Sequence, residues 1–375
     1  MVVAKLLLAL LAALFVLQTG LALFRSRAWW VRVCDFPRLQ IALGALVILG
    51  CFWFVNLGAE DPATWEWILF GALGAAVLVQ TYQMLPYTKA WRKQVPSAAP
   101  SSARRDRLRV VISNVCMKNR DVRRWLGVVR NAEADLVIAV EVDAWWCSQL
   151  RVLHEEYPHR VLRPQDNTYG IALYSRLPLR HTEIKELIEQ DVPSVFTQVM
   201  LRSGQRVRCV ALHPRPPRPD IQQDSDLRDA ELVLAGKQIR EEDTPVLVAG
   251  DLNDVAWSHT THLFQRIARL LDPRIGRGLF STFHANHRFM RWPLDHVFHS
   301  RHFHVVEVRR LGHVGSDHFP ILVELALQPA PLSESKVDPA DHSDFEEAQE
   351  AVTEAREHQA EETPQERRER SRADL

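Results

Sequence analysis

The chain of 375 residues predicts a mixed α/β domain that follows a membrane anchor. Three long apolar runs occupy most of residues 1–88. Between residues 108 and 327, β-rich runs alternate with amphipathic helical patterns, and toward Val323 the strands follow one another more closely. Several of these runs end at an acid, an amide or a histidine. The fold class is therefore α/β, with candidate functional groups at strand ends.

Composition is compatible with a catalytic domain plus a second part. The formal net charge is +0, but the chain after about Ser335 is rich in acids and Lys89–Arg109 is rich in bases, so the balance says little about partners. The five cysteines are scattered and show no CxxC spacing. They indicate neither a disulfide framework nor a zinc ribbon, and we expect reduced thiols.

The anchor consists of three apolar segments, each about as long as the ~20 residues that a helix needs to cross a bilayer. They are Val3–Phe24, Leu39–Ala59 and Trp65–Leu85. A cleaved signal peptide is the alternative for the first, but its apolar core is too long and no small-residue cleavage motif precedes Arg25. We expect three transmembrane helices.

The basic residues of the connecting segments predict the orientation of the anchor. Arginines lie within the first loop and Lys and Arg follow the third span, whereas the loop near Glu60 and Asp61 has neither. The basic residues are Arg25, Arg27, Arg32, Arg38, Lys89, Arg92 and Lys93. We therefore expect the amino terminus outside the cell and the chain after Leu85 in the cytoplasm.

Two segments are expected to lack regular structure. Residues 89–107 are interpreted as a linker, since Val95–Arg107 is rich in Pro, Ser and Ala and has no apolar period. Residues 328–375 are expected to be a disordered acidic tail with no catalytic role, because they contain few large apolar residues. Within that tail, Phe345–His358 is predicted to be at most a transient helix, and its protein partner is unknown.

The domain begins with a strand at Leu108–Val115 that contains Asn114 near its end. Apolar spacing predicts an amphipathic helix at Asp121–Arg130, and a buried strand follows at Asp135–Val140. Glu141 comes directly after this strand. Taken alone, such an acid is more often exposed to solvent than functional.

Three more β-rich runs follow, at Tyr169–Ser175, Val195–Met200 and Arg206–Leu212. The last run leads to His213 and to a proline-rich stretch with two arginines, Arg215 and Arg218. That stretch is either a rigid phosphate-binding loop or a solvated polyproline connector. Ser225–Lys237 is predicted to be a helix.

The run Val246–Asp254 (VLVAGDLND) reads as a buried strand that delivers polar groups to its end. Asp251 and Asn253 lie two residues apart, so an extended chain places both side chains on one face. An Asx turn explains the same pattern. Acid and histidine recur in Leu294–Phe298 (LDHVF) and Gly315–Ile321 (GSDHFPI), which favours a functional site.

The candidate residues share oxygen or imidazole groups at predicted strand ends. They are Asn114, Glu141, His213, Asp251, Asn253, Asp295, Asp317 and His318. Carboxylate and amide oxygens favour Mg²⁺ or Mn²⁺ over Zn²⁺. Two further histidine pairs, His259/His262 and His284/His287, have no acidic or cysteine partner nearby in sequence and are interpreted as surface residues.

The ordered set of motifs resembles the endonuclease/exonuclease/phosphatase superfamily of metal-dependent phosphoesterases. The motifs, in chain order, are SNV, the strand-end Glu141, YGIALYSRLPL, ALHP, GDLND, PLDHVF and GSDHFPI, between Leu108 and Leu325. The resemblance implies a four-layer sandwich, with two mixed β-sheets face to face and helices outside. This chain resembles a bacterial-type, membrane-anchored member.

The resemblance also implies a role for each candidate. Glu141, with Asn114 and Asp317, is expected to bind Mg²⁺, with Mn²⁺ as the alternative. His318 is expected to contact the scissile phosphate and transfer a proton, with Asp295 orienting its ring. The remaining candidates are expected to position the attacking water (Asp251) and to bind phosphate oxygens (Asn253 and His213).

The expected activity is hydrolysis of a phosphodiester or phosphomonoester, with either a lipid headgroup or nucleic acid as the substrate. The anchor favours a substrate at the bilayer, and no Lys/Arg stripe with interleaved aromatic residues marks a nucleic-acid groove. The alternative of a different class is a non-catalytic membrane scaffold that binds a partner through the acidic tail.

Overall fold

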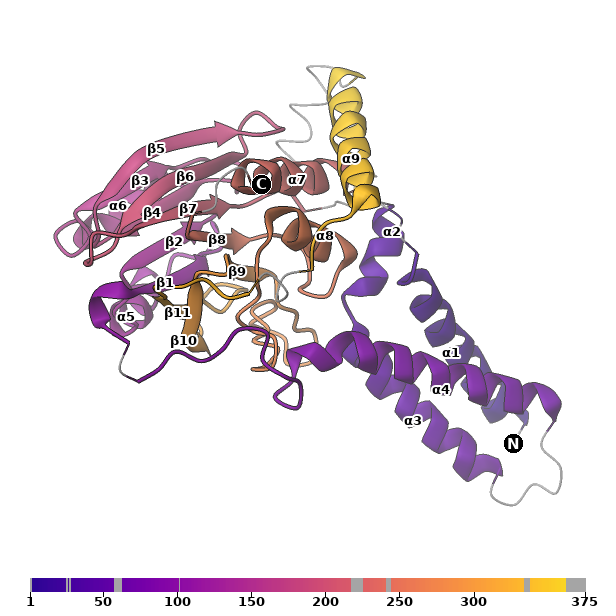
Figure 1. The fold of residues 1–375 in the computed structure, drawn as a ribbon. Helices are drawn as coiled ribbons and strands as arrows, with labels where there is room; N and C mark the ends of the chain where they lie inside the picture. Colours follow the sequence, from indigo (N-terminus) through magenta and orange to yellow (C-terminus); the bar gives the residue numbers. More distant parts are fainter. Residues whose placement is uncertain are drawn as a thin grey trace.

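The computed structural model describes residues 2–24, 26, 28–56, 63–100, 102–216, 225–240, 244–333 and 338–361. These residues form an elongated helical arm and a domain built on two β-sheets (Figure 1). The acidic loop near Glu60 and Asp61, the basic residues Arg25 and Arg27, and Arg218 lie outside the described residues.

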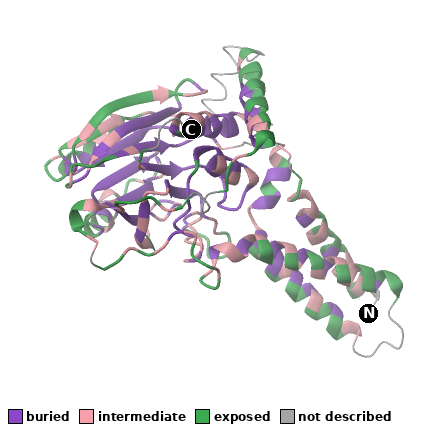
Figure 2. Cartoon of the chain, in the orientation of Figure 1, coloured by how far each residue is buried: buried purple, intermediate pink, exposed green. Residues whose placement is uncertain are grey.

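The arm contains three long helices, α1 (Val2–Leu21), α3 (Arg38–Asn56) and α4 (Thr64–Met84). All three are long and apolar enough to cross a membrane. Much of their apolar surface is exposed, whereas the central strands of the domain are buried and some edge strands, above all β5 (Leu179–Glu186), are partly exposed (Figure 2). The three apolar helices expected from the sequence are therefore present. A short helix, α2 (Trp29–Arg32), joins α1 to α3.

The first sheet has six strands in the order β10-β11-β1-β2-β4-β3. Its strands are β1 (Arg107–Asn114), β2 (Leu136–Val140), β3 (His159–Arg163), β4 (Ile171–Ser175), β10 (Phe303–Arg310) and β11 (Ile321–Leu327). Only β1 and β2 pair in parallel, so the sheet is mixed.

The second sheet has five strands in the order β5-β6-β7-β8-β9. Its strands are β5 (Leu179–Glu186), β6 (Pro193–Met200), β7 (Arg206–Leu212), β8 (Val246–Asp251) and β9 (Asp295–His299). Here β7 and β8 form the parallel pair. Strands β1 and β2 of the first sheet face β8 and β9 of the second.

Helices cover the outer face of each sheet. Helices α5 (Val122–Asn131) and α6 (Ala144–Gln149) pack on the first sheet, and α7 (Asp226–Arg240) and α8 (His259–Ala268) pack on the second. The resulting layers, helix, sheet, sheet and helix, confirm the predicted sandwich of two mixed sheets flanked by helices.

Alternation along the strands divides the apolar residues between two cores. In β1, Val110 and Ile112 face the space between the sheets, whereas Val111 faces the helices. In β8, Leu247 and Ala249 face inward and Val248 faces outward. The next residues along each inward-facing row are polar, and they form the candidate site.

The segment expected to be a linker is packed against the domain. Val95 is fully buried in the core between the sheets. Gln94 accepts a hydrogen bond from the backbone N–H of Asp272 at 2.9 Å, and Ser97 pairs with Val305 beside β10. A stretch without periodicity still packs here, because one apolar side chain and a few backbone hydrogen bonds fix it.

The expectation of a wholly disordered tail is wrong for residues 342–361, which form helix α9 (His342–Glu361). Ala348, Val352 and Ala355 are buried against α7 and α8. At the start of the helix, Asp344 forms an ion pair with Arg266 at 2.6 Å. Small apolar residues three and four positions apart make one face of α9 apolar, although the segment as a whole is polar.

The arm is fixed to the domain by buried polar contacts. Arg32 of α2 forms an ion pair with Asp229 of α7 at 2.8 Å and also donates to Thr260 of α8. The indole N–H of Trp257 donates to the carbonyl oxygen of Asp35 at 2.8 Å. The position of the domain relative to the arm is thus defined by side-chain contacts as well as by the chain connection.

Candidate functional site

The candidate site lies where the ends of the two parallel strand pairs meet. Asn114 ends β1 and Asp251 ends β8, each two residues beyond an inward-facing core residue. Asp295 begins β9 and is registered with Asp251, because β8 and β9 are antiparallel. The row of apolar side chains between the sheets therefore continues as a row of polar ones.

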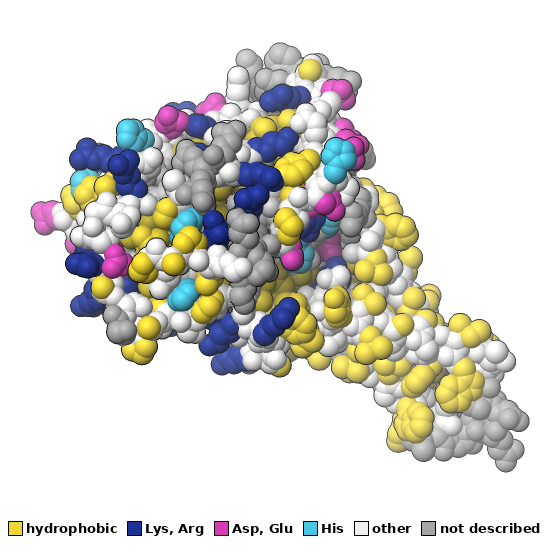
Figure 3. All heavy atoms as spheres, in the orientation of Figure 1, with side chains coloured by type: hydrophobic (Ala, Val, Ile, Leu, Met, Phe, Trp, Pro, Cys, Tyr) yellow, Lys and Arg dark blue, Asp and Glu magenta, His cyan; other side chains and the backbone are white. Residues whose placement is uncertain are grey.

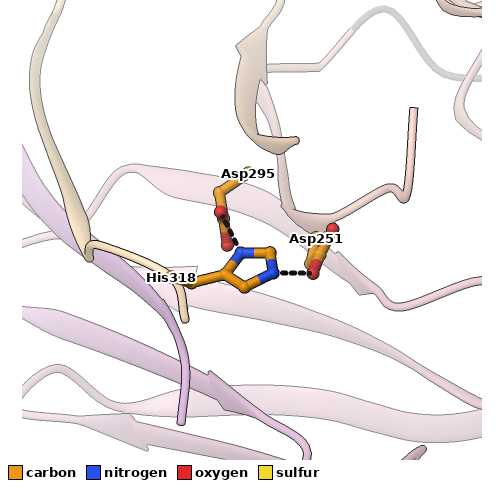
Figure 4. A group of neighbouring side chains, drawn as sticks. All are labelled: Asp251, Asp295 and His318. Atoms are coloured by element: carbon orange, nitrogen blue, oxygen red, sulfur yellow. Dashed lines mark hydrogen bonds and ion pairs between the residues drawn. The ribbon is translucent and has the colours of Figure 1, made fainter. Parts of the chain in front are cut away.

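His318 lies between two buried carboxylates, as Figure 4 shows. Its Nδ1 is 2.8 Å from Oδ2 of Asp295, and its Nε2 is 3.6 Å from Oδ2 of Asp251. The ring also packs on Phe283, with 4.9 Å between the ring centroids. The backbone N–H of His318 donates to the hydroxyl of Ser316 at 2.9 Å. The imidazole therefore has a carboxylate beside each ring nitrogen and an aromatic ring packed on one face.

The carboxylates around His318 raise the pKa of its imidazole. Burial disfavours the charged ring, but the carboxylates of Asp295 and Asp251 outweigh burial and raise the pKa of His318 to about 10. The pKa of Asp251 is also raised, and burial is the largest cause. Attraction to His318 lowers this pKa, whereas repulsion from Asp295 raises it further. The geometry thus favours an imidazolium between the two acids.

Asn114 links Asp251 to Glu141. Its side-chain N–H groups donate to Oδ2 of Asp251 at 3.0 Å and to Oε1 of Glu141 at 2.7 Å. The second carboxylate oxygen of Glu141 accepts from the backbone N–H of Met117 at 3.1 Å. Glu141 adopts a left-handed backbone conformation with φ of 62°, which turns the chain at the end of β2.

The remaining candidates lie in the segments around these strand ends. Asn253 donates through its side chain to the carbonyl oxygen of Pro214 at 2.9 Å. Nδ1 of His213 lies 3.2 Å from the carbonyl oxygen of Asp251, so that nitrogen carries the hydrogen. Asp317 is half-buried and directly precedes His318. The structure therefore brings five of the eight candidates into direct side-chain contact, and His213, Asn253 and Asp317 are neighbours.

One carboxylate oxygen at the site lacks a partner. Oδ1 of Asp295 is buried and has no hydrogen-bond partner among the described residues. Atoms of Asp251, Asp295 and His318 lie within 4.8 Å of one another, a spacing that could hold a metal ion. However, Nδ1 of His318 and Oδ2 of Asp295 already bond each other.

Further oxygen groups lie beside that pair. Glu141 and Asp251 are carboxylates joined through the amide of Asn114, and Asp317 directly precedes His318. Such a donor set suits Mg²⁺ or Mn²⁺. The residues present therefore fit a divalent cation of this class.

Several supporting residues were not among the sequence candidates. The hydroxyl of Thr282 accepts from the backbone N–H of Asp295 at 3.2 Å. The Asn119 side chain donates to the carbonyl oxygens of Val115 and Val314, at 3.1 and 3.2 Å, and so joins the segment after β1 to the loop before His318. The bond from Asn119 to Val314 joins residues distant in sequence, and no local pattern indicates it.

A second group lies beside His213, and among its members the sequence singled out Arg215. Tyr169 packs on the His213 ring with centroids 5.6 Å apart, and the guanidinium of Arg215 lies 4.5 Å from the Tyr169 ring centroid. Arg215 is buried and forms an ion pair with Glu189 at 3.1 Å. The basic stretch after β7 is therefore built into the domain at Arg215, not solvated there.

The two histidine pairs interpreted as surface residues differ from that expectation in part. His262 lies against the arm, with Nε2 3.2 Å from the hydroxyl of Tyr87, and burial lowers its pKa to about 4. His259 lies 2.7 Å from Glu347 of α9, an acidic partner that is distant in sequence. His287 is exposed.

Comparison with known proteins identifies the family. A family model described as the endonuclease/exonuclease/phosphatase family matches residues 112–318, more than half of the chain. A UPF0294 protein of Erwinia tasmaniensis is 29% identical over 231 residues, which cover 58% of this chain and 81% of that protein.

Two solved structures illustrate the likeness in fold. One is an endonuclease/exonuclease/phosphatase from Beutenbergia cavernae, with a TM-score of 0.50 and 19% identity over 61% of this chain and 73% of that one. Another, from Bacteroides vulgatus, has a TM-score of 0.48 and 17% identity over 59% of this chain and 99% of that one.

Proposed function

Because the chain belongs to the endonuclease/exonuclease/phosphatase family, we propose that it is a membrane-anchored, metal-dependent hydrolase of phosphoric esters. The observation that carries the proposal is the buried imidazole of His318 between Asp295 and Asp251, at the edge where both sheets end. Burying two carboxylates beside an imidazole costs free energy, and packing a histidine in a core does not require them. Such clusters of buried titratable groups are typical of functional sites.

In this proposal, His318 acts as a proton donor and phosphate-binding group. Its bond to Asp295 fixes the ring orientation and leaves Nε2 directed at the position of the Asp251 carboxylate. When an ester enters, Nε2–H donates to a phosphate oxygen or to the leaving oxygen, and Asp295 stabilises the imidazolium.

Asp251 is the group that positions and deprotonates the attacking water. Its raised pKa, caused first by burial, makes it a stronger base than an exposed aspartate. Asn253 retains a second side-chain N–H for a phosphate oxygen after its bond to Pro214. His213 bonds the Asp251 carbonyl through Nδ1, so its Nε2 donates to phosphate only when the ring is protonated.

Glu141, Asn114 and Asp317 are the residues that would hold Mg²⁺ or Mn²⁺. When bound, the cation would neutralise charge that develops on the phosphoryl oxygens. Asn114 donates to Glu141 and to Asp251 and so joins the two carboxylates. The Asn114 contacts therefore orient the acids.

A substrate at the bilayer is the favoured class. The three apolar helices support an integral membrane location, and the contacts of Arg32 and Trp257 hold the domain at one end of the arm. In Figure 1 the amino terminus lies at the far end of the arm from the domain, consistent with an external amino terminus and a cytoplasmic domain. A lipid headgroup is thus proposed ahead of nucleic acid.

The test uses the full chain in detergent with bis-p-nitrophenyl phosphate and p-nitrophenyl phosphate as the diester and monoester. With Mg²⁺ we expect hydrolysis of at least one, loss of activity with EDTA, and a decrease of about 10²–10⁴-fold for His318→Ala. His304→Ala, a half-buried histidine of β10, is the matched control and should retain activity. Activity that survives both EDTA and His318→Ala would refute the proposal.

A second readout is independent of turnover. Mg²⁺ that binds the folded state should raise the melting temperature of the wild type, and Glu141→Gln should reduce that increase because it removes a charged ligand. Vesicles containing phospholipid, and single-stranded and duplex DNA, then distinguish the substrate classes.

A further inference from the structure

An arginine-rich cavity lies outside the proposed catalytic site, between the arm and the domain. It has a volume of about 590 Å³ and is lined by residues of α3, β10 and the segment before β9. Its charged lining consists of Arg288, Arg291, Arg309 and Arg310, and no acidic residue lines it among the described residues. Figure 3 shows Lys and Arg side chains beside apolar ones where the domain meets the arm.

Two of these arginines are brought close together. The guanidinium carbons of Arg291 and Arg310 lie 5.1 and 4.4 Å from the centroid of the same ring, Phe319. Backbone carbonyl oxygens, including those of His287 and Ser281, accept hydrogen bonds from them. No carboxylate pairs with either among the described residues.

The other two arginines add to the positive charge. Arg288 is exposed and has no ion pair with a described residue, and only Arg309 has an acid, Glu307, at 2.9 Å. Glu307 is shared with Arg109 of β1 at 3.3 Å. The cavity therefore has a surplus of positive charge, which an anion would neutralise.

The cavity also has an apolar side, at the end of α3 nearest the domain. Leu39 and Gln40 of the first turn of α3 line it, and the side chain of Gln40 donates to the carbonyl oxygen of Phe289 at 2.6 Å. Phe289 is 87% exposed and the adjacent Met290 is 52% exposed. Arginines directly flank this apolar pair, the arrangement that side chains adopt at the boundary between headgroups and acyl chains.

We propose that this cavity binds the phosphate of an anionic phospholipid, with Phe289 and Met290 inserted at the acyl boundary of the same leaflet. The proposal rests on the membrane anchor proposed above, because α3 places the cavity at the headgroup level only if α3 crosses the bilayer. A bilayer lipid is favoured over a soluble anion since the cavity is lined by both arginines and exposed apolar side chains.

The lipid would also be connected to the candidate catalytic site. The segment that carries Phe289 continues back to Phe283, which packs on His318, and the backbone N–H of Ala285 donates to the carbonyl oxygen of Asp317. A bound lipid would therefore stabilise the segment that contacts the catalytic histidine. This makes the cavity a positioning site next to the reaction centre, distinct from the phosphate-binding groups there.

The test measures lipid retained by the full chain. The protein is reconstituted in equimolar phosphatidylglycerol and phosphatidylcholine, extracted in mild detergent and analysed by native mass spectrometry. Wild type should retain phosphatidylglycerol preferentially, and Arg288→Gln/Arg309→Gln should lower that retention at least about fivefold, since one surface arginine near anionic lipid contributes roughly that factor. Among the described residues neither side chain donates to a backbone carbonyl, and the one ion pair removed, Arg309 with Glu307, is partly exposed, so we expect the variant to fold.

The control is Arg123→Gln, which removes the same charge from an exposed position of α5, far along the chain from the cavity. It should not alter retention. Equal retention in the double variant and wild type would overturn the proposal, and so would full displacement of the lipid by millimolar inorganic phosphate, which would indicate a site for soluble anions.

The same preparations separate this inference from the proposed activity. Ester hydrolysis without preferential retention of phosphatidylglycerol overturns the lipid site alone. Preferential retention without metal-dependent hydrolysis supports the lipid site and overturns the enzyme. Wild-type protein that stays outside the vesicles on reconstitution would overturn the anchor and the lipid site together.

Discussion

Glu231 of α7 is a buried acid outside the candidate site, and its environment predicts an effect on stability. It is 2% exposed, and its Oε1 accepts from the hydroxyl of Ser194 at 2.8 Å. Burial, the largest cause, raises its pKa to about 8. In the folded protein the carboxyl therefore keeps its proton well above the pH at which the unfolded chain releases it.

The sign of the pH effect follows from proton binding. Between about pH 4.5 and pH 8 the folded state binds more protons at Glu231 than the unfolded state, so stability decreases as pH rises. Each pH unit in this range costs up to about 1.4 kcal/mol. Glu231→Gln keeps an acceptor for Ser194 and removes this dependence.

We therefore expect the melting temperature of Glu231→Gln to exceed that of wild type at pH 8 and to equal it near pH 4. Glu350→Gln, at an exposed position of α9, should show no difference at either pH. A constant offset between Glu231→Gln and wild type across this range would contradict the assignment.

Single residues of the candidate site were predictable to different degrees. Asn114, Asp251 and Asp295 were identifiable because each ends or begins an apolar run, and alternation then places them between the sheets. Thr282 was not, since its hydrogen bond to Asp295 joins a loop to a strand that only the tertiary fold brings together. The role of Tyr169 beside His213 depends on the same long-range packing.

At the scale of elements, helix α9 is the clearest difference between expectation and structure. Composition predicted disorder because the segment has few large apolar residues. The structure shows that small ones suffice when they share a face, since Ala348, Val352 and Ala355 pack on Leu227 and Ile267 of α7 and α8. A compositional criterion cannot detect a surface supplied by other helices.

This packing predicts the effect of a charge in α9. Val352→Asp buries an unpaired carboxylate against α7 and should lower stability by several kcal/mol, while Thr353→Asp places the same charge on the exposed side. For a domain of this size, each kcal/mol corresponds to about 2–4 °C in melting temperature. Thermal unfolding gives the melting temperatures of both variants, and we expect that of Val352→Asp to be the lower. Equal melting temperatures would show that α9 is not packed in solution.

At the scale of the whole molecule, the boundaries of the folded unit extend beyond the catalytic domain. Residues 108–327 were expected to fold as a unit, with a linker before and a tail after. Met84 and Tyr87 instead pack with Trp257 and Leu294 of the domain, and Phe36 joins the same cluster. The arm and the domain therefore share a hydrophobic core that domain-level sequence patterns do not reveal.

We expect a fragment of residues 89–327 to be less stable than the full chain in detergent. It exposes Trp257 by removing Tyr87, and it exposes the faces of α7 and α8 by removing α9. A fragment of residues 89–361 should be intermediate, because it keeps α9 only. Soluble yield and melting temperature rank the stability of the full chain and the two fragments. An 89–327 fragment as stable as the full chain would contradict the prediction.

The alternation of inward and outward side chains in β1, β7, β8 and β9 also limits how the gene for such a protein can change in length. Inserting or deleting one codon within β8 upstream of Gly250 would move Asp251 out of the row with Leu247 and Ala249 and turn it toward the helices. A two-codon change would restore the parity but shift the pairing of Asp251 with Asp295. We therefore expect insertions and deletions to be tolerated in the loops. Within a strand, the number of residues before the polar end cannot change without moving the polar side chain away from the site.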